Sequence, residues 1–235
     1  MIDFTGSEEE YREFSLCARK LMSALGTSAE EVAKPFSPEL SEDNEGLKSA
    51  SQVQYVCRAG NYRNKGLEYT GSLRVLKVMM GYDYLWNNIR VKGGAYGCMS
   101  GFGRNGDSYF VSYRDPHLSE TIDIYEKIPE YLKNYEADER TMTQYIIGAI
   151  SALDTPLTPQ GKALRSLVSY LTGLDEADYQ KERDELLGTT PEKIRELAEY
   201  CKAVLDDKAL CVVGGDAKIE ENKGLFGTTA PLIIG

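Results

Sequence analysis

The sequence predicts an α+β fold with two layers, in which helices cover one face of a largely antiparallel sheet. Three features lead to this prediction. The first half combines strand patterns with a strong hairpin signal, and amphipathic helices separate these strands. The last third is mostly helical and contains one short apolar strand. With 235 residues the chain is long enough for a substantial core, and we expect residues 1–235 to form a single domain.

A strand and a helix are expected at the N-terminus. Residues 1–6 have the composition of a strand that begins at once, as though the chain had been cut from something longer. Between residues 8 and 25, apolar side chains recur at helical spacing, which predicts a helix that ends at Gly26. The polar, proline-containing residues 35–46 predict a loop.

A half-buried strand and a long helix come next. Apolar and polar side chains alternate along residues 51–59, as in a strand with one buried face. The face expected to be buried carries Val53, Tyr55 and Cys57. Residues 69–89 carry apolar side chains at helical spacing and predict one continuous helix. This helix would lead the chain into the glycine-rich residues 90–97.

A β-hairpin is expected after the glycine-rich segment. Residues 98–102 and 108–113 are apolar runs with strand composition, and Asn105-Gly106 lies between them. Asn-Gly between apolar runs is the strongest short sequence signal for a two-stranded hairpin. The hairpin is the main reason to expect an antiparallel sheet.

Helices dominate the remainder of the chain. Asp115-Pro116 predicts an N-cap and a first-turn proline for a helix to about residue 134. Residues 139–153 predict a second helix, whose expected buried side carries Ile146, Ile147 and Ile150. Further helix starts are expected at Thr158, at Asp175 with Asp178, and at Thr190. Residues 210–213 predict a short strand that ends at Gly214-Gly215.

The composition argues against two classes of partner and indicates a compartment. The formal net charge of −10, without a basic patch, argues against nucleic acid. No apolar run reaches the roughly 18 residues that a membrane span requires, and the N-terminus lacks the pattern of a signal peptide. The five cysteines are scattered, with no C-x-x-C pair. Such cysteines are typical of reduced thiols, which predicts a cytoplasmic protein.

The chain offers no recognisable metal or cofactor site. His117 is the single histidine, so the H-x-x-E-H zinc signature of inverzincin peptidases cannot be built. The G-x-G-x-x-G string of residues 101–106 leads into a strand and already accounts for the hairpin turn, which makes nucleotide binding a weak interpretation. We therefore expect neither a metal nor a cofactor in this chain.

The residues between the long helix and the hairpin carry the best candidate for chemistry. Arg90 and Tyr96 flank a bend that contains Gly93 and Gly94. Guanidinium and phenol groups are both donors that can stabilise a developing negative charge. The same residues also allow a structural interpretation, in which the arginine meets the helix dipole and the tyrosine packs in a strand.

This segment, Arg90 to Gly97, is similar to the Arg-x-x-Gly-Gly-x-Tyr-Gly segment in the C-terminal half of insulinase-type zinc metallopeptidases. The resemblance is to the branch that contains the presequence proteases. It covers nearly the whole chain and includes residues 54–56, 112–116, 145–148 and 155–161. The zinc-bearing N-terminal half and the linker of these enzymes have no counterpart in the sequence.

The resemblance implies a role for each candidate residue. In these peptidases two homologous halves close like a clamshell. The N-terminal half holds zinc, and the C-terminal half offers an arginine and a tyrosine to the substrate carbonyl and the tetrahedral intermediate. Arg90 and Tyr96 are therefore the expected catalytic residues. Gly93 and Gly94 are the expected substrate-binding residues, because an extended peptide backbone could lie close to them.

The resemblance also implies partners and leaves one alternative. The expected partners are the N-terminal half of the same peptidase and a peptide substrate, and the fragment alone should be inactive and bind no zinc. The alternative is a catalytically inactive structural or interaction domain, because the same fold serves as a scaffold in core subunits of mitochondrial respiratory complexes. The presence of both Arg90 and Tyr96 favours the peptidase.

Overall fold

The computed structural model of the protein describes residues 2–25 and 44–232. The chain divides into two compact units. The first comprises Met1–Ser41 and Asp154–Tyr179, and the second comprises Glu42–Leu153 and Gln180–Gly235. The second unit holds the sheet and every candidate site residue, so its architecture positions the site.

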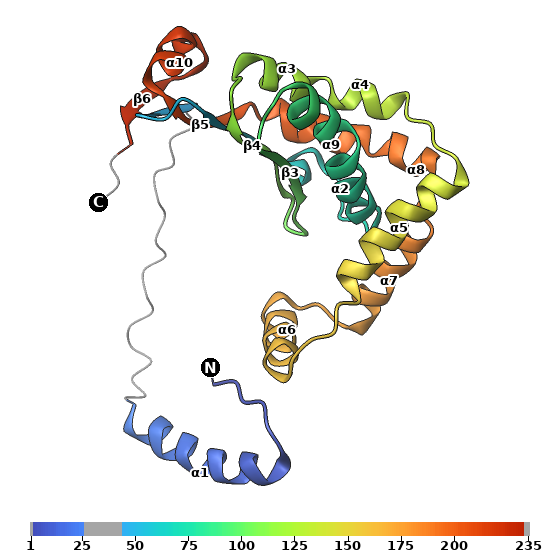
Figure 1. Ribbon diagram of the computed structural model, residues 1–235. Coiled ribbons are helices and arrows are strands. Elements are labelled where there is room, and N and C mark those ends of the chain that lie inside the picture. The colour runs from blue at the N-terminus through green and yellow to red at the C-terminus, as the bar shows by residue number, and fades with distance from the viewer. Residues whose placement is uncertain (1, 26–43, 233–235) are drawn as a thin grey trace. The chain divides into compact units, whose positions relative to one another are not determined.

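The second unit contains a mixed sheet. Among the described residues, its neighbouring strands follow the order β3-β4-β2-β5-β1-β6 across the sheet (Figure 1). The strands are β1 (Glu45–Ser49), β2 (Gln54–Asn61), β3 (Gly97–Phe102), β4 (Asp107–Asp115), β5 (Ala209–Gly215) and β6 (Thr228–Pro231). The β3–β4, β4–β2 and β2–β5 pairs are antiparallel, whereas β1 runs parallel to both β5 and β6. The expected largely antiparallel sheet and the hairpin are confirmed.

The described helices complete an α+β fold, as the sequence predicts. They are α1 (Glu8–Ala24), α2 (Ser72–Tyr82), α3 (Ser119–Glu126), α4 (Ile128–Lys133), α5 (Glu139–Leu153), α6 (Pro159–Thr172), α7 (Glu176–Leu187), α8 (Pro191–Glu196), α9 (Ala198–Asp206) and α10 (Asp216–Glu221). Short 3₁₀ turns occupy Tyr62–Lys65 and Lys223–Leu225, and a π-helical segment occupies Trp86–Lys92. Helix α2 packs on β3, and α3 and α9 pack on β2.

The buried face of β2 is the opposite of the one expected. Gln54, Val56 and Arg58 are buried, whereas Tyr55 is 42% exposed. The two polar side chains find partners inside the protein. The Gln54 Oε1 atom accepts the Gly215 N–H at 2.9 Å, and Arg58 Nη2 donates to the Leu205 carbonyl oxygen at 3.0 Å. Because internal hydrogen bonds offset the desolvation of these groups, the apolar alternation predicted the wrong face.

The expected continuous helix over residues 69–89 is interrupted. Helix α2 ends at Tyr82, and Asp83 leaves helical geometry with φ −117° and ψ −89°. The Asp83 carboxylate accepts hydrogen bonds from Asn87 Nδ2 at 3.1 Å and Tyr131 Oη at 2.8 Å. Aspartate often favours such local bonds over a helix interior, which explains the break. The chain then resumes as the π-helical segment.

The expected helix from residue 115 to 134 is also wrong in detail. Asp115 ends β4, and its carboxylate accepts the His117 N–H at 2.9 Å and the Thr121 hydroxyl at 2.8 Å. The helical region begins only at α3 and is divided into α3 and α4. Pro129 lies in the first turn of α4, and its missing N–H accounts for the division.

The remaining expectations have mixed outcomes. Residues 2–6 form no strand, so the expected N-terminal strand is wrong. The loop expected over residues 35–46 is wrong at residues 45 and 46, which belong to β1. Gly26 and residues 35–43 lie outside the described residues. The bounds of α5 are as expected. Ile146 and Ile150 pack against the core, as predicted, beside the buried Met142 and Ala149, whereas Ile147 is 56% exposed. The Thr158 and Thr190 caps are confirmed, and Asp175 and Asp178 cap each other's backbone N–H at the start of α7.

Glycine at position 60 allows β2 to approach α9, and we expect Gly60→Ala to destabilise the protein. A Cβ atom there would lie 2.2 Å from the Val204 carbonyl oxygen, which belongs to the backbone and cannot move aside easily. Overpacking of this kind typically costs about 1–3 kcal/mol of unfolding free energy. The matched control is Gly81→Ala in α2, where a Cβ atom would have no neighbour within 4 Å apart from the adjacent residues and the backbone of its own helix. Urea titrations of both variants measure the free energy of unfolding, which Gly81→Ala should leave unchanged or raise. If Gly60→Ala is as stable as Gly81→Ala, the close contact between position 60 and Val204 does not limit stability.

Candidate functional site

The π-helical segment presents Arg90 to solvent. Its guanidinium carbon lies 4.2 Å from the centre of the Trp86 ring, one helical turn earlier. Stacking on an indole face attracts a cation and limits the rotamers of the side chain. Arg90 itself is exposed, and the Trp86 ring retains 37% exposure. The arginine is therefore held in place while its N–H groups remain available.

Gly93 and Gly94 turn the chain from the π-helical segment toward β3. Gly94 has a φ of +76°, which side chains rarely tolerate, and its N–H donates to the Arg90 carbonyl oxygen at 2.9 Å. The Ala95 N–H donates to the Ile89 carbonyl oxygen at 3.1 Å. A Cβ atom at position 93 would lie 2.5 Å from that carbonyl oxygen. Both glycines are therefore required by the turn itself.

Tyr96 follows this turn and lies beside Arg90. The centre of its ring is 5.9 Å from the Arg90 guanidinium carbon and 5.8 Å from that of Arg114. Its edge packs against the Tyr113 ring with centroids 5.5 Å apart, and its N–H donates to the Arg114 carbonyl oxygen at 3.3 Å. The side chain is nevertheless 58% exposed. The structure thus brings the two predicted catalytic residues together on an accessible surface at the sheet edge formed by β3.

Two residues of this cluster were missed by the sequence analysis. Trp86 precedes Arg90 by four positions, and that spacing in a helical segment is a signal that could have identified it. Arg114 has no comparable signal, because its position depends on a left-handed backbone with φ 51° in the strand opposite β3. We refer to Trp86, Arg90, Tyr96 and Arg114 as the Arg–Tyr cluster.

The charge of the Arg–Tyr cluster extends to Cys98 on β3. Burial raises the pKa of the Cys98 thiol to about 11, and the Arg90 charge opposes this rise only partly. The thiol therefore stays protonated at neutral pH, and a thiolate is the nucleophilic form of cysteine. The cluster consequently offers hydrogen-bond donors and positive charge but no nucleophile of its own.

Among residues 2–25 and 44–232, no three His, Cys, Asp or Glu side chains come together in a way that could hold a metal ion. His117 lies in the turn before α3 rather than in a helix, with Nδ1 3.7 Å from a Glu120 carboxylate oxygen. All five cysteines are free thiols. Within the same residues, no helix is long and apolar enough to cross a membrane.

The arrangement is suited to stabilising negative charge on a bound carbonyl group. A guanidinium and a phenol are both hydrogen-bond donors, and here both are exposed and packed against aromatic rings. A second guanidinium, that of Arg114, lies 5.8 Å from the centre of the Tyr96 ring and adds positive charge to the cluster. Preorganised donors of this kind are most useful where charge develops during a reaction.

Comparisons with known proteins identify the family of this chain. The family model described as the PreP C-terminal domain matches residues 44–215. Protein HypA of Clostridium perfringens is 42% identical over 233 residues, which are 99% of this chain and 24% of the relative. Presequence protease 1, chloroplastic/mitochondrial, of Arabidopsis thaliana is 35% identical over 188 residues, 78% of this chain and 17% of the relative. The chain thus spans only a quarter or less of these relatives' length.

Solved structures show the same fold. Pitrilysin matches 85% of this chain with a TM-score of 0.57 at 14% identity, and the match covers 22% of the pitrilysin chain. A peptidase M16 inactive domain from Pseudomonas fluorescens matches 95% of this chain with a TM-score of 0.57 at 17% identity, over 53% of that chain. The chain therefore belongs to the presequence-protease C-terminal domain family, and is a C-terminal domain of the insulinase-type peptidases.

Proposed function

We propose that this chain is the C-terminal part of a zinc metalloendopeptidase that degrades peptides, and that it supplies Arg90 and Tyr96 to the substrate carbonyl. The single observation that carries the proposal is the proximity of these two exposed donors in a chain of a peptidase family. As the carbonyl oxygen becomes negative in the transition state, Tyr96 Oη and the Arg90 guanidinium would donate hydrogen bonds to it. The Trp86 ring orients Arg90 for this task.

Gly93 and Gly94 would let the peptide backbone approach the cluster. Neither residue has a side chain, and Gly94 has no contact closer than 3.8 Å at its Cβ position, where the Pro116 ring lies. Strand β3 follows directly and lies at the edge of the sheet, so an extended peptide could run beside it. The substrate of this proposal is therefore an extended peptide rather than a compact protein.

The donor set of residues 2–25 and 44–232 does not fit zinc. Because no suitable group of ligands converges among the described residues, the proposal assigns zinc to the N-terminal half and no chemical step of the metal to this chain. The contribution proposed here consists of binding and orienting the carbonyl group. We also propose a cytoplasmic location, from the scattered free thiols, which cell fractionation would test.

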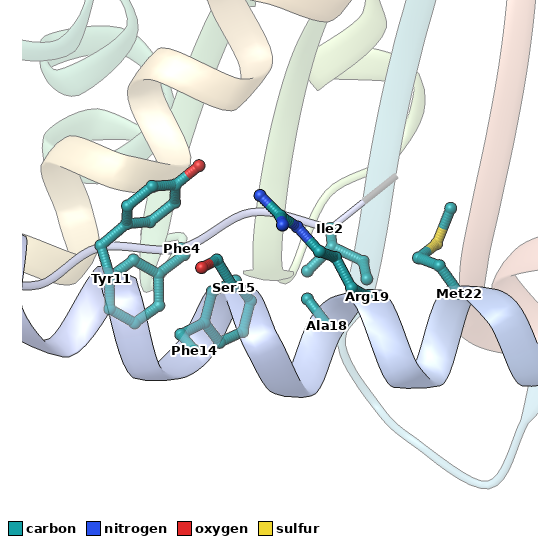
Figure 2. Close-up of a pocket in the computed structure, with 8 residues that line it drawn as sticks. All are labelled: Ile2, Phe4, Tyr11, Phe14, Ser15, Ala18, Arg19 and Met22. Atoms are coloured by element: carbon teal, nitrogen blue, oxygen red, sulfur yellow. The ribbon is translucent and has the colours of Figure 1, made fainter.

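Helix α1 offers a surface for the proposed partner half. No residue of this helix is buried, although one side is apolar. An open cavity of about 490 Å³ runs along that side (Figure 2). It is lined by Ile2, Phe4, Tyr11, Phe14, Ser15, Ala18, Arg19 and Met22. Since relatives are about four times as long as this chain, we propose that the remainder of the protein covers this surface.

The test of the proposed function is reconstitution from two pieces. The 235-residue chain alone should not hydrolyse a fluorogenic peptide, and addition of the separately purified N-terminal half should restore hydrolysis. Met22→Asp should weaken this reassembly, because it introduces a charge into the apolar cavity, whereas Glu13→Gln on the same helix should not. Full activity of the chain alone, or no activity after verified reassembly, would contradict the proposal.

The alternative is a catalytically inactive structural or interaction domain. One observation favours it: the Pseudomonas fluorescens neighbour is described as an inactive domain. The two proposals differ in their dependence on the Arg–Tyr cluster. A structural domain would support reassembly and hydrolysis equally well without the Tyr96 hydroxyl, whereas a catalytic domain would not.

A further inference from the structure

Two cysteines that lie far apart in the sequence are direct neighbours in the sheet. Cys57 on β2 and Cys211 on β5 lie opposite each other in the antiparallel β2–β5 pair, and both are free thiols. Residues directly opposite in such a pair have Cα atoms about 4.5–5.5 Å apart and side chains on the same face of the sheet. A disulfide needs Cα atoms about 4.4–6.8 Å apart. The register therefore places these two residues, the cross-strand thiol pair, within reach of a covalent bond.

The cross-strand thiol pair lies on the face of the sheet opposite the buried core. Val56 and Val212, each one position away along its strand, are fully buried and belong to the core. Side chains alternate between the two faces along a strand, so the two thiols project from the other face. Each cysteine is partly exposed there, and Tyr55 on the same face is 42% exposed. A small oxidant in solution can therefore reach the sulfur atoms.

No other thiol of the second unit competes for this pair among the described residues. The outer neighbours of the pair in the sheet are Val111 of β4 and Glu45 of β1. Cys98 on β3 is paired with Ser112, which is fully buried and therefore lies on the core face. Cys201 is buried in the core on α9. A disulfide within the sheet thus has one geometrically favoured pairing.

The reduced pair is expected to react slowly at neutral pH. Burial is the main cause that raises the pKa of Cys57 and the pKa of Cys211 above the ordinary value of a thiol. Both groups are therefore protonated at neutral pH, whereas the thiolate is the form that attacks a disulfide. Oxidation consequently requires a lasting change in the surrounding thiol–disulfide balance rather than a brief exposure.

We propose that Cys57 and Cys211 form a reversible disulfide between β2 and β5 by exchange with a low-molecular-weight disulfide such as oxidised glutathione. One cysteine thiolate attacks the oxidant, releases one glutathione thiolate and leaves a mixed disulfide on the protein. The other cysteine attacks the protein sulfur of that mixed disulfide and releases the second glutathione thiolate. The two released thiolates take up the two protons that the cysteines lose. One disulfide is thereby reduced as another forms.

The bond would connect the two parts of the sheet. Strand β2 is followed on one side by β4 and β3, and β5 is followed on the other side by β1 and β6. A link between residues 57 and 211 closes a loop that contains most of the chain, and such links stabilise a protein by restricting its unfolded state. Neither cysteine belongs to the Arg–Tyr cluster, so the inference does not depend on the proposed peptidase function.

The experiment is overnight incubation of the folded 235-residue chain with oxidised glutathione at about pH 8.5, where more thiolate is present. Free thiols are then alkylated, and the tryptic peptides are analysed by mass spectrometry. Residues 49–58 and 209–218 should be recovered as one linked peptide that dithiothreitol separates. Recovery of these two peptides unlinked, whether alkylated or carrying glutathione, would overturn the proposal.

Stability measurements on variants provide a second readout. Oxidation should raise the urea midpoint of the wild type by on the order of 1 M, and dithiothreitol should reverse this rise. Cys57→Ser should show no rise, whereas the matched control Cys98→Ser should behave like the wild type. A rise of wild-type size in a folded Cys57→Ser variant would overturn the proposal. If that variant does not fold, the linked peptide of the wild type decides.

Discussion

Under the proposed function, Tyr96→Phe in the full-length protein is expected to lower kcat for peptide hydrolysis by about 10²–10³, the usual effect of losing one oxyanion donor. Arg90→Ala should lower kcat to a similar extent. Because both donors would act mainly on charge that develops in the transition state, KM should change little and kcat/KM should fall with kcat. Steady-state kinetics on a fluorogenic peptide measure both constants.

The substitution Tyr96→Phe separates catalysis from packing. It leaves the ring contacts with Tyr113, Arg90 and Arg114 in place, and the hydroxyl is on an exposed side chain. The free energy of unfolding should therefore stay within about 0.5 kcal/mol of the wild type, and the zinc content should not change. Tyr82→Phe, at a side chain that is 75% exposed, is the matched control. If Tyr96→Phe keeps a near wild-type kcat, Tyr96 has only the packing role.

Glu182→Gln is expected to have the largest effect on stability. The Glu182 side chain is 1% exposed on α7, and its carboxylate accepts from Tyr69 Oη, Arg74 Nε and Arg104 Nη2. It thereby connects α7 with α2 and with the turn between β3 and β4. Loss of the negative charge leaves two guanidinium groups facing a neutral amide. Because both arginines keep partial access to water, we expect a loss of about 2–3 kcal/mol rather than the full value for a buried pair.

The same carboxylate should make stability depend on pH. Burial alone would raise the pKa of Glu182, but the hydrogen bonds from Tyr69, Arg74 and Arg104 outweigh it and lower the pKa below its ordinary value of 4.5. In the folded state the group thus binds a proton less readily than in the unfolded state. Its contribution to stability is complete above about pH 4.5 and is lost as the pH falls through the lowered pKa.

Urea titrations at pH 7 and at pH 3 test both the stability cost of Glu182→Gln and its dependence on pH. Wild type and Glu182→Gln should differ strongly at pH 7 and converge toward pH 3. The matched control is Glu199→Gln, which removes an exposed ion pair with Lys133 and should cost less than about 1 kcal/mol. Equal effects of the two substitutions at pH 7 would show that the buried cluster does not stabilise the fold.

The sequence was informative where a local signal decides the structure. The hairpin follows from Asn105-Gly106, and the helix starts at Thr158 and Thr190 follow from their caps, because these bonds form between neighbours in the chain. The bend at Gly93-Gly94 and the proximity of Arg90 to Tyr96 could be predicted for the same reason. In each case the residues that interact lie within a few positions of one another.

The sequence failed where distant partners decide. The buried face of β2 depends on hydrogen bonds between Gln54 and Gly215 and between Arg58 and Leu205. No local sequence pattern predicts these hydrogen bonds. The end of α2 depends partly on Tyr131, which lies far along the chain. Arg114 joins the Arg–Tyr cluster only because β4 pairs with β3. Strands β1 and β6 were missed because each is short and is completed by its neighbours in the sheet.

The position of β1 in the sheet has a consequence for biosynthesis. This strand comes early in the chain, yet it lies between β5 and β6, which come last, and Glu45 pairs with both Cys211 and Thr228. While the ribosome is still translating the middle of the chain, β1 has no neighbour and one side of β2 is unpaired. Unpaired strand edges promote association with other chains, and pairings between distant segments form slowly. The sheet can therefore close only after the C-terminal strands emerge, and nascent chains truncated before β5 should depend on chaperones to stay monomeric.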